Sequence, residues 1–431
     1  MRVAVLGMWH LGTVTAACLA SVGHSVVGFD ADAAVVGRLR EGRSPIAEPG
    51  LDDLVAAGLK AKTLTFSSTP SDIASADVIW VAYDTPVRED DTADVGTVIE
   101  RVRALFPHFR DGVLVLVSSQ LPVGSTRRLE ELYAGARPNV QVSFAYSPEN
   151  LRLGKSLDVF LRPDRVVAGV RDEASRARIT ALLAPVTDKI EWMAVESAEM
   201  TKHALNAFLA TSITFINEIA GLCERVGADA GEVAKALKSD VRIGPRAYLQ
   251  PGAAFAGGTL ARDLSFLAAV GVDVQRPTHL ISSVASSNVA HRQWPLLRLR
   301  ELLGRLDSQR IAVLGLTYKP GTDTLRRSTA IELCRELHAA GASVAGYDPA
   351  LTTLPEELTR IIDLQSSPEQ ALRGAVAVLV GTDCSEFRSL RPDDVVAWMK
   401  QPLVLDPGGF LESVLGTSDR IRYVKVGRQR D

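Results

Sequence analysis

Short apolar runs that alternate with helical patterns constrain the fold of this 431-residue chain more than any other feature. Apolar residues recur at helical spacing over residues 11–22 and 95–105. Between such segments of the first half lie apolar runs at residues 3–6, 25–29, 78–82, 113–117 and 142–145. Buried strands that alternate with helices indicate a parallel sheet with helices on both faces. We therefore predict an α/β fold for this part of the chain.

The strand signal disappears between about residues 197 and 273. One long helical pattern covers residues 197–226, and a second runs from about 277 to 306, where Pro295 should kink or end the helix. Alternation resumes at residue 310, with a helix over 329–340 and strands at 311–314, 343–347, 376–380 and 403–405. This second α/β half shows no obvious sequence repeat of the first.

These patterns predict two Rossmann-like doubly wound domains joined by a central helical domain. The predicted boundaries are 1–190 for the first domain, 191–306 for the helical domain and 307–431 for the last domain. A chain of this length is too long for one hydrophobic core, which also favours several domains.

Composition excludes several classes of protein. The 48 basic and 51 acidic residues leave a net charge of −3 and form no block of like charge, so neither a nucleic-acid nor a membrane partner is expected. Residues 1–7 read directly as a strand and a turn, not as a signal peptide, and no apolar run is long enough to span a bilayer. The four cysteines are far apart, which argues against disulfides or a metal site. A reduced cytoplasmic protein is expected.

The turn after the first strand reads G-M-W-H-L-G at residues 7–12 and is followed by a helical pattern. This is the setting in which G-x-G-x-x-G binds a dinucleotide, with Gly7 and Gly12 as its first and third glycines. Asp30 ends the second strand, where a carboxylate accepts hydrogen bonds from ribose hydroxyls and repels a 2′-phosphate, so NAD is favoured over NADP. Trp9 replaces the second glycine and must swing away, shift the dinucleotide or block it. The alternative is a Rossmann domain that has lost its cofactor.

Further segments match a family pattern over nearly the whole chain. They are E-P-G-L at 48–51, T-P at 85–86, S-Q-L-P-V-G-S at 119–125, S-P-E-N-L-R-L-G at 147–154, S-A-E-M-T-K at 197–202, A-F-A-G-G-T-L-A-R-D at 254–263, G-L-T-Y-K-P at 315–320 and T-D-T-L-R-R-S at 322–328. With these motifs the chain resembles the UDP-glucose/GDP-mannose dehydrogenase family, the nucleotide-sugar 6-dehydrogenases.

The resemblance implies NAD as cofactor, a nucleotide sugar as substrate, with UDP favoured, and a homodimer. It implies cofactor contacts from Gly7, Trp9, Gly12, Asp30, Thr85 and Arg326. It implies substrate contacts from Leu151, Lys202, Asn206, Arg242, Tyr248, Gly257 and Lys319, with Arg242 reaching the substrate of a neighbouring subunit. The implied catalytic residues are Glu149, Lys202, Asn206, Thr259 and Asp263.

The chain departs from the family pattern at its catalytic centre. Thr259 occupies the position of the nucleophilic cysteine, and a one-residue gap would place Leu260 there instead. Gln120 replaces a threonine that helps to position water, and Leu153 replaces a second glutamate. In the family the cysteine traps the aldehyde product of the first oxidation, so that a second hydride transfer and hydrolysis give an acid. A threonine hydroxyl needs a strong neighbouring base to do this, and no such base is evident.

Three functions remain open on these residues. The first, which we favour, is a two-electron oxidoreductase that interconverts an alcohol and a carbonyl on a nucleotide sugar. The second is a full four-electron 6-dehydrogenase that works without the thiol. The third is a catalytically inactive nucleotide-sugar-binding protein, for which Trp9 is the main argument.

Overall fold

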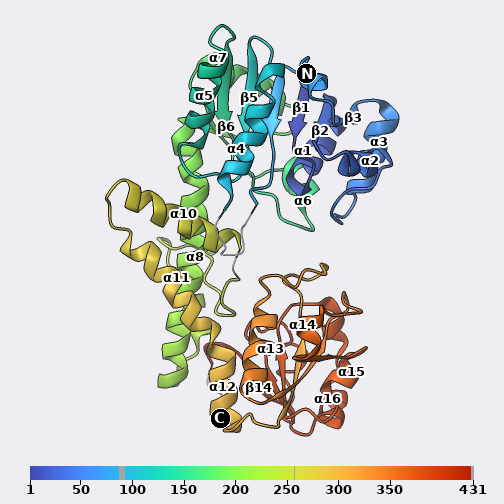
Figure 1. The fold of residues 1–431 in the computed structure, drawn as a ribbon. Helices are drawn as coiled ribbons and strands as arrows, with labels where there is room; N and C mark the ends of the chain where they lie inside the picture. Colours follow the sequence, from blue (N-terminus) through green and yellow to red (C-terminus); the bar gives the residue numbers. More distant parts are fainter. Residues whose placement is uncertain (87–92, 257, 429–431) are drawn as a thin grey trace. The chain divides into compact units, whose positions relative to one another are not determined.

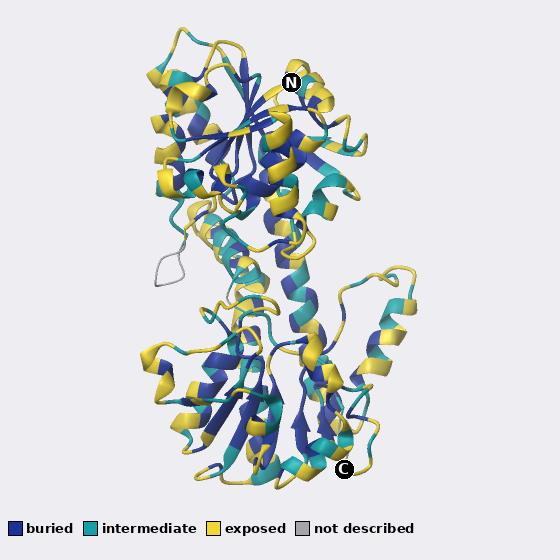
Figure 2. Ribbon diagram, turned by 90° about the vertical axis from the view of Figure 1, so that its right-hand side faces the viewer, coloured by how far each residue is buried: buried dark blue, intermediate teal, exposed yellow. Residues whose placement is uncertain are grey.

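The structure is a computed structural model that describes residues 1–86, 93–256 and 258–428 (Figure 1). It divides into two compact units, Met1–Ala204 and Leu205–Asp431. Each unit contains one sheet, and the central strands of each sheet are buried (Figure 2). The two units are described in turn.

The first unit is built on an eight-stranded sheet with the order β3-β2-β1-β4-β5-β6-β7-β8. Its strands are β1 (Arg2–Leu6), β2 (Ser25–Phe29), β3 (Leu64–Ser67), β4 (Val78–Val81), β5 (Val113–Val117), β6 (Val142–Tyr146), β7 (Val166–Gly169) and β8 (Ile190–Met193). Strands β1 to β6 pair in parallel, as predicted, whereas β6 and β7 pair antiparallel. The strand order reverses between β1 and β4, which is where open α/β sheets bind ligands.

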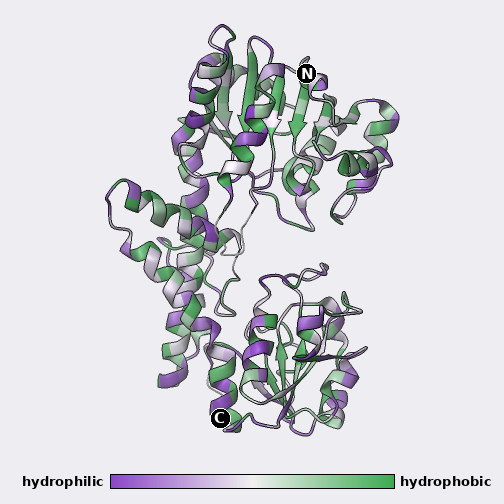
Figure 3. Cartoon of the chain, viewed as in Figure 1, coloured by the Kyte–Doolittle hydropathy of each residue, from purple (hydrophilic) through white to green (hydrophobic). Residues whose placement is uncertain are grey.

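Alternating side chains of the strands feed two hydrophobic cores, one on each face of this sheet. In β1, Val3 and Val5 join one core, and Ala4 and Leu6 join the other. The first core also receives α1 (His10–Ser21), α2 (Ala33–Arg40), α3 (Leu51–Ala61), α6 (Ser156–Leu161) and α7 (Glu173–Leu183). The second receives α4 (Val95–Ala104) and α5 (Ser125–Ala136). Helices therefore cover both faces, because both faces are apolar (Figure 3).

The second unit begins with helices: α9 (Ala230–Ser239), α10 (Thr259–Asp273), α11 (His279–Arg292), α12 (Trp294–Leu303) and most of the long helix α8 (Val195–Val226). A small core formed by α8, α10 and α11 contains Ala207, Ala210, Leu264 and Val284. The predicted helical stretch 277–306 is two helices, because α11 ends at Arg292 and Pro295 lies in the first turn of α12. A proline is tolerated there because that N–H has no partner within the helix.

Helix α8 is the one described segment that is long and apolar enough to cross a membrane by length and composition. Core helices of soluble proteins pass the same test, and part of the most apolar window of α8 is buried inside the protein. This property of α8 is therefore weak evidence for a membrane span.

The second unit ends in a six-stranded parallel sheet with the order β11-β10-β9-β12-β13-β14. Its strands are β9 (Arg310–Leu314), β10 (Ser343–Tyr347), β11 (Ile362–Leu364), β12 (Ala377–Val380), β13 (Leu403–Leu405) and β14 (Arg422–Val424). Its helices are α13 (Thr329–Ala339), α14 (Glu356–Thr359), α15 (Pro368–Leu372) and α16 (Pro392–Trp398). The predicted second Rossmann-like domain is confirmed.

The two sheets begin with a short repeat that the sequence analysis missed. Residues 3–7 read V-A-V-L-G and residues 311–315 read I-A-V-L-G, while S-V-V-G-F-D at 25–30 corresponds to S-V-A-G-Y-D at 343–348. Gly7 and Gly315 both have positive φ, at 91° and 85°, and each N–H donates to the last carbonyl of the neighbouring strand. The expectation of no obvious repeat was therefore wrong for these segments, which the fold places at equivalent positions.

The repeated aspartates differ in what they leave accessible. Asp348 is 1% exposed, and its Oδ2 accepts hydrogen bonds from the N–H groups of Leu316 and Thr317, at 2.8 and 3.0 Å, and from the Thr317 hydroxyl at 2.9 Å. Asp30 is only partly buried and accepts from the Met8 N–H at 2.7 Å. Asp30 also accepts from the Asp32 N–H at 3.0 Å, so both aspartates hold main-chain groups, but only Asp30 is accessible to a ligand.

We predict that Asp348→Asn lowers the free energy of unfolding by about 2 kcal/mol, because an amide cannot accept all of these buried donors. Asp30→Asn, the matched variant in the first domain, should have a smaller effect because its site is wetter. Urea denaturation of both variants and the wild type measures the difference. Equal losses would contradict the distinction between the two aspartates.

Candidate functional site

The fold requires glycine at positions 7 and 12 of the first turn, whereas position 9 of the same turn accommodates a tryptophan. A Cβ on Gly12 would lie 1.7 Å from the Gly7 carbonyl oxygen, and a Cβ on Gly7 would lie 2.5 Å from the Tyr83 ring. Trp9 is 46% exposed at the residue that precedes α1. The fold therefore accepts an indole at the point where a dinucleotide's pyrophosphate approaches the backbone. Gly7, Gly12 and Asp30 fit NAD, and Trp9 is the residue of this turn that departs from the dinucleotide-binding pattern.

A buried carboxylate ties the cofactor turn to a second loop. Oε2 of Glu48 lies 2.9 Å from Nε2 of His10 and accepts hydrogen bonds from the Gly154 N–H and the Ser156 hydroxyl, each at 3.0 Å. Burial alone would raise the pKa of the Glu48 carboxyl, but hydrogen bonds from Ser156, His10 and Gly154 outweigh it and lower that pKa. His10, the first residue of α1, thus has a positioning role that the sequence did not indicate.

Thr85 and Gln120 belong to loops that follow neighbouring strands, β4 and β5. The Thr85 hydroxyl donates to the Gln120 carbonyl oxygen at 2.7 Å, and both residues are buried. The hydrogen bond holds the two loops together at the carboxyl edge of the sheet. Thr85 is therefore placed where a cofactor can bind, and its predicted contact with NAD stays a prediction.

Lys202 of α8 is a buried cation held by the loop that follows β6. Its Nζ donates to the Glu149 carbonyl oxygen at 2.6 Å and lies 3.4 Å from Oε1 of the same residue. The other carboxylate oxygen of Glu149 accepts from the Leu151 N–H at 2.9 Å. The structure thus brings together three residues predicted for catalysis and substrate binding. A buried, paired ammonium of this kind can orient a substrate oxygen.

Sequence reasoning missed the residue that positions Lys202. Glu199 is fully buried one turn earlier in α8, and it accepts hydrogen bonds from the Gly124 N–H at 2.6 Å and from the N–H and hydroxyl of Thr126 at 2.9 and 2.7 Å. These groups lie at the beginning of α5, where a carboxylate is favoured by the helix dipole. Nothing in the motif S-A-E-M-T-K distinguishes this structural glutamate from a catalytic one.

In the second unit, Asn206 and Asp263 form a buried pair. The Asn206 side-chain amide of α8 donates to the Asp263 carboxylate, one turn into α10. Thr259 is the first residue of α10 and is exposed, and it follows Gly258, the residue that caps that helix. The pair anchors the first turn of α10 to α8 and so fixes where the Thr259 hydroxyl lies.

Every cysteine of the chain is buried in a hydrophobic core. Cys18 and Cys334 are fully buried, and Cys223 and Cys384 are nearly so. Burial raises the pKa of Cys18, Cys334 and Cys384 to about 12. Because all four thiols are buried, none of them is accessible to replace the cysteine of the family pattern.

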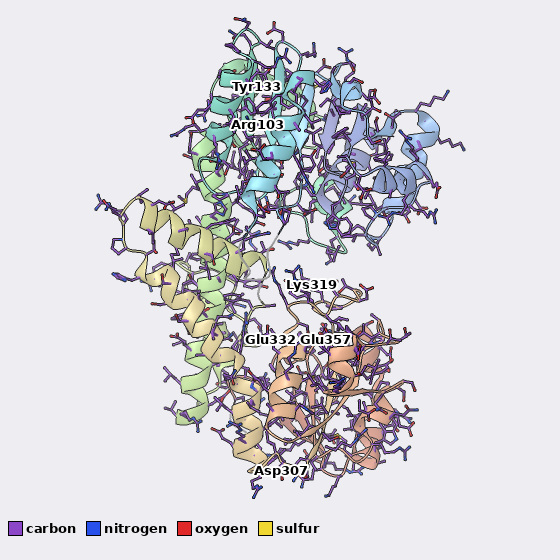
Figure 4. The ribbon with its side chains drawn as sticks, viewed as in Figure 1. Arg103, Tyr133, Asp307, Lys319, Glu332 and Glu357 are labelled. Carbon is purple, nitrogen blue, oxygen red and sulfur yellow. The ribbon has the colours of Figure 1, made fainter. Side chains whose placement is uncertain are left out.

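The remaining predicted substrate and cofactor residues lie on exposed segments. Arg242 pairs with Asp240 two residues away, at 2.6 Å, and Tyr248 is exposed. Lys319 and Arg326 lie in the exposed loop between β9 and α13, where Figure 4 labels Lys319. Gly257 lies outside the described residues. The roles of these residues stay predictions.

A cavity of about 230 Å³ lies at the carboxyl edge of the second sheet, between α11, α12 and α13. Its lining includes Glu332, Glu336 and Arg292, and Arg292 pairs with Glu332 at 3.2 Å. Two carboxylates and one guanidinium leave this lining net acidic, which disfavours a diphosphate. Figure 4 labels Glu332 on α13 and Lys319 on the preceding loop. The assignment of a phosphate contact to Lys319 therefore stays a prediction.

The fold combines two Rossmann-like α/β domains with a helical segment between them. Three domain models of the UDP-glucose/GDP-mannose dehydrogenase family match the chain: the NAD-binding domain at residues 1–187, the central domain at 196–290 and the UDP-binding domain at 312–413.

Relatives match over their full length. The UDP-glucose 6-dehydrogenase of Rhizobium meliloti is 34% identical over 99% of this chain and 100% of its own, and that of Pseudomonas aeruginosa is 33% identical over 100% and 98%. The structure of a UDP-glucose dehydrogenase from Pyrobaculum islandicum superposes with a TM-score of 0.87 at 30% identity and covers 99% of this chain and 98% of that one. The chain therefore belongs to the UDP-glucose/GDP-mannose dehydrogenase family, the NAD-dependent oxidoreductases of nucleotide sugars.

We predict that the protein binds NAD in preference to NADP, and that Trp9→Gly tightens NAD binding. Asp30 supplies the preference, and the exposed indole of Trp9 crowds the pyrophosphate position. Calorimetric titration of both proteins with NAD and NADP measures both effects. Tighter binding of NADP, or an unchanged NAD affinity in Trp9→Gly, would contradict this account of the turn.

Proposed function

We propose that the protein catalyses a two-electron oxidation of a hydroxyl group on a UDP-sugar, or the reverse reduction of the carbonyl. The observation that carries this proposal is Thr259 at the beginning of α10, together with the burial of every cysteine of the chain. A hydride transfer needs no nucleophilic side chain, whereas trapping the carbonyl product needs one, and the family pattern has a cysteine where this chain has Thr259. The reaction therefore stops at the carbonyl, after one hydride has left the sugar carbon and one proton has left its hydroxyl.

The chain retains the residues that such a step needs. NAD, when bound at the turn of residues 7–12 with Asp30 on its ribose, supplies the hydride acceptor. Lys202, held by Glu149, is a cation that can stabilise negative charge developing on the sugar oxygen. Asn206, held by Asp263, is a neutral donor one turn further along α8. We assign Leu151, Arg242, Tyr248, Gly257 and Lys319 to substrate binding, with Lys319 on a phosphate and Arg242 reaching the substrate of a neighbouring subunit.

Two other functions are possible for the chain, and a single residue bears on each of them. A four-electron 6-dehydrogenase, the activity in the names of the R. meliloti and P. aeruginosa relatives, would need Thr259 or water to replace the thiol. A binding protein without activity is favoured by Trp9 at the cofactor turn. The retained pairs Glu149–Lys202 and Asn206–Asp263 argue against this last reading.

We predict one NADH per sugar consumed and a carbonyl product. The test incubates the protein with NAD and a panel of UDP-, GDP-, CDP- and dTDP-sugars, and measures NADH by absorbance and the product by mass spectrometry. A ratio near two with an acid product would establish the four-electron enzyme, and no NADH with any sugar would favour the binding protein.

Variants extend this test to the catalytic centre. Thr259→Cys alone should not restore acid formation, because Gln120 and Leu153 also depart from the family pattern. The triple variant Thr259→Cys, Gln120→Thr and Leu153→Glu restores all three family residues and is the matched comparison. Acid formation by the single variant would show that the thiol alone is the missing element.

We also propose that the protein is a homodimer built on α8. Phe208, Phe215 and Leu222 are seven residues apart, so they lie on one face of the helix, and they are 70%, 46% and 63% exposed. A monomer would leave this apolar stripe in water. The exposed turn of Arg242 suits a residue that reaches a neighbouring subunit.

In this assembly residues 1–190 bind NAD, residues 191–306 form the dimer contacts and residues 307–431 bind the UDP moiety. We place the protein in the cytoplasm.

We predict that Phe215→Glu converts the dimer into a monomer, because it buries a charge in the apolar stripe. Sedimentation velocity at micromolar concentration measures the change. Lys235→Glu, at an exposed position of α9, is the control and should leave the dimer intact. A wild type that sediments as a monomer would reject the dimer.

A further inference from the structure

The hydroxyl of Tyr318 lies against the beginning of α10. A Cβ built on Gly258 would lie 2.6 Å from the Tyr318 hydroxyl oxygen and 3.6 Å from Cζ of the same ring. Gly258 has φ −164°, an extended conformation that any residue adopts, so the phenol and not the backbone excludes a side chain there. Thr259, the residue at the nucleophile position, is the next residue. Tyr318 thus places a second hydroxyl beside the altered catalytic centre.

The backbone that carries Tyr318 is rigidly held. The N–H of Tyr318 donates to the Thr324 carbonyl at 2.7 Å, and the carbonyl of Thr317 accepts from the buried Thr382 hydroxyl at 2.8 Å. The N–H of Thr317 is bound by the buried Asp348. Because these three hydrogen bonds already hold the loop, little conformational entropy is lost when the Tyr318 side chain binds a ligand.

The phenol is available for such a ligand. Tyr318 is partly exposed, and no group in the described part of the chain forms a hydrogen bond with its hydroxyl. The Lys319 ammonium lies 5.5 Å from the centre of its ring. By contrast, Tyr347 in the same domain donates its hydroxyl to Glu386 at 2.7 Å. The segment G-L-T-Y-K-P at residues 315–320 resembles G-L-A-F-K-P in the family pattern, which has phenylalanine at position 318. The hydroxyl, like Thr259, is therefore a departure of this chain from the family pattern.

We propose that Tyr318 is a substrate-contacting residue whose hydroxyl donates a hydrogen bond to a sugar oxygen at the reacting end of the nucleotide sugar. The proposal rests on the proposed function, since it places the sugar beside Thr259. It adds that the centre has gained a neutral donor where it has lost a thiol. A neutral donor can bind an alcohol or carbonyl oxygen, but it does not trap a carbonyl covalently. This behaviour suits a two-electron reaction, in which the carbonyl product is released without being trapped.

The first test compares Tyr318→Phe with the wild type. We expect kcat/KM for the UDP-sugar to fall about tenfold, the loss typical of one hydrogen bond. The KM for NAD and the thermal midpoint should stay unchanged, because the ring and its packing remain. Tyr347→Phe is the matched control and should leave kcat/KM unchanged. An unchanged kcat/KM in Tyr318→Phe, or an equal loss in the control, would overturn the proposal.

The second test is a double-mutant cycle with Gly258→Ala. In the wild type, the new Cβ collides with the Tyr318 hydroxyl oxygen and must displace it, so kcat/KM should fall. In Tyr318→Phe the same Cβ meets a ring carbon at 3.6 Å, an ordinary contact, so alanine should add little further loss. Equal losses from Gly258→Ala in both backgrounds would show that the hydroxyl does not act at this position.

Different results would reject the proposed function and the proposed role of Tyr318. If the wild type forms no NADH with any nucleotide sugar, the proposed function fails, and the affinity for UDP-glucose, measured by calorimetry, replaces kcat/KM. Weaker UDP-glucose binding in Tyr318→Phe then supports the contact, and equal binding overturns it. A wild type that neither oxidises nor binds UDP-glucose or the other sugars of the panel rejects both.

Discussion

Hydrogen bonds to buried carboxylates of helix α8 are the interactions on which the packing of both units depends. Glu199 accepts three hydrogen bonds from the beginning of α5, and Glu224, near the other end of α8, accepts from the Trp294 indole and the Gly427 N–H, each at 2.8 Å. A buried carboxylate is stable only when its oxygens are satisfied, so each contact holds the helix in one register. Lys202 and Asn206, which project from α8 between these two anchors, are fixed by them.

The same anchoring logic appears at the turns of both sheets, with different outcomes. Asp348 is consumed by main-chain donors and supports the loop that carries Tyr318 and Lys319. Asp30 bonds the Met8 N–H but stays accessible for a ribose. The repeated strands and turn, which belong to a strand-helix-strand unit in each domain, therefore form a scaffold in the second domain and the predicted cofactor site in the first. Because both residues are aspartates, their different roles follow from their different burial.

The sequence anticipated much of the architecture, because buried strands and amphipathic helices have different periods. It located five strands of the first sheet, four strands of the second, the helical segment and the break at Pro295, but it did not predict β3, β7, β8, β11 or β14. Because β7 was not among the predicted strands, its antiparallel pairing with β6 was not anticipated either. It also missed the repeat between the domains, whose helices share no comparable pattern.

By itself, the sequence determined the fold class, the family and the absence of a thiol at position 259, because each follows from residue types at fixed spacings. Only the tertiary structure decided that all four cysteines are inaccessible, that Glu199 and Glu48 position neighbouring loops, and that Tyr318 meets Gly258. These contacts join segments tens of residues apart in the chain. Their geometry follows from the packing of whole elements, which no local pattern of residues encodes.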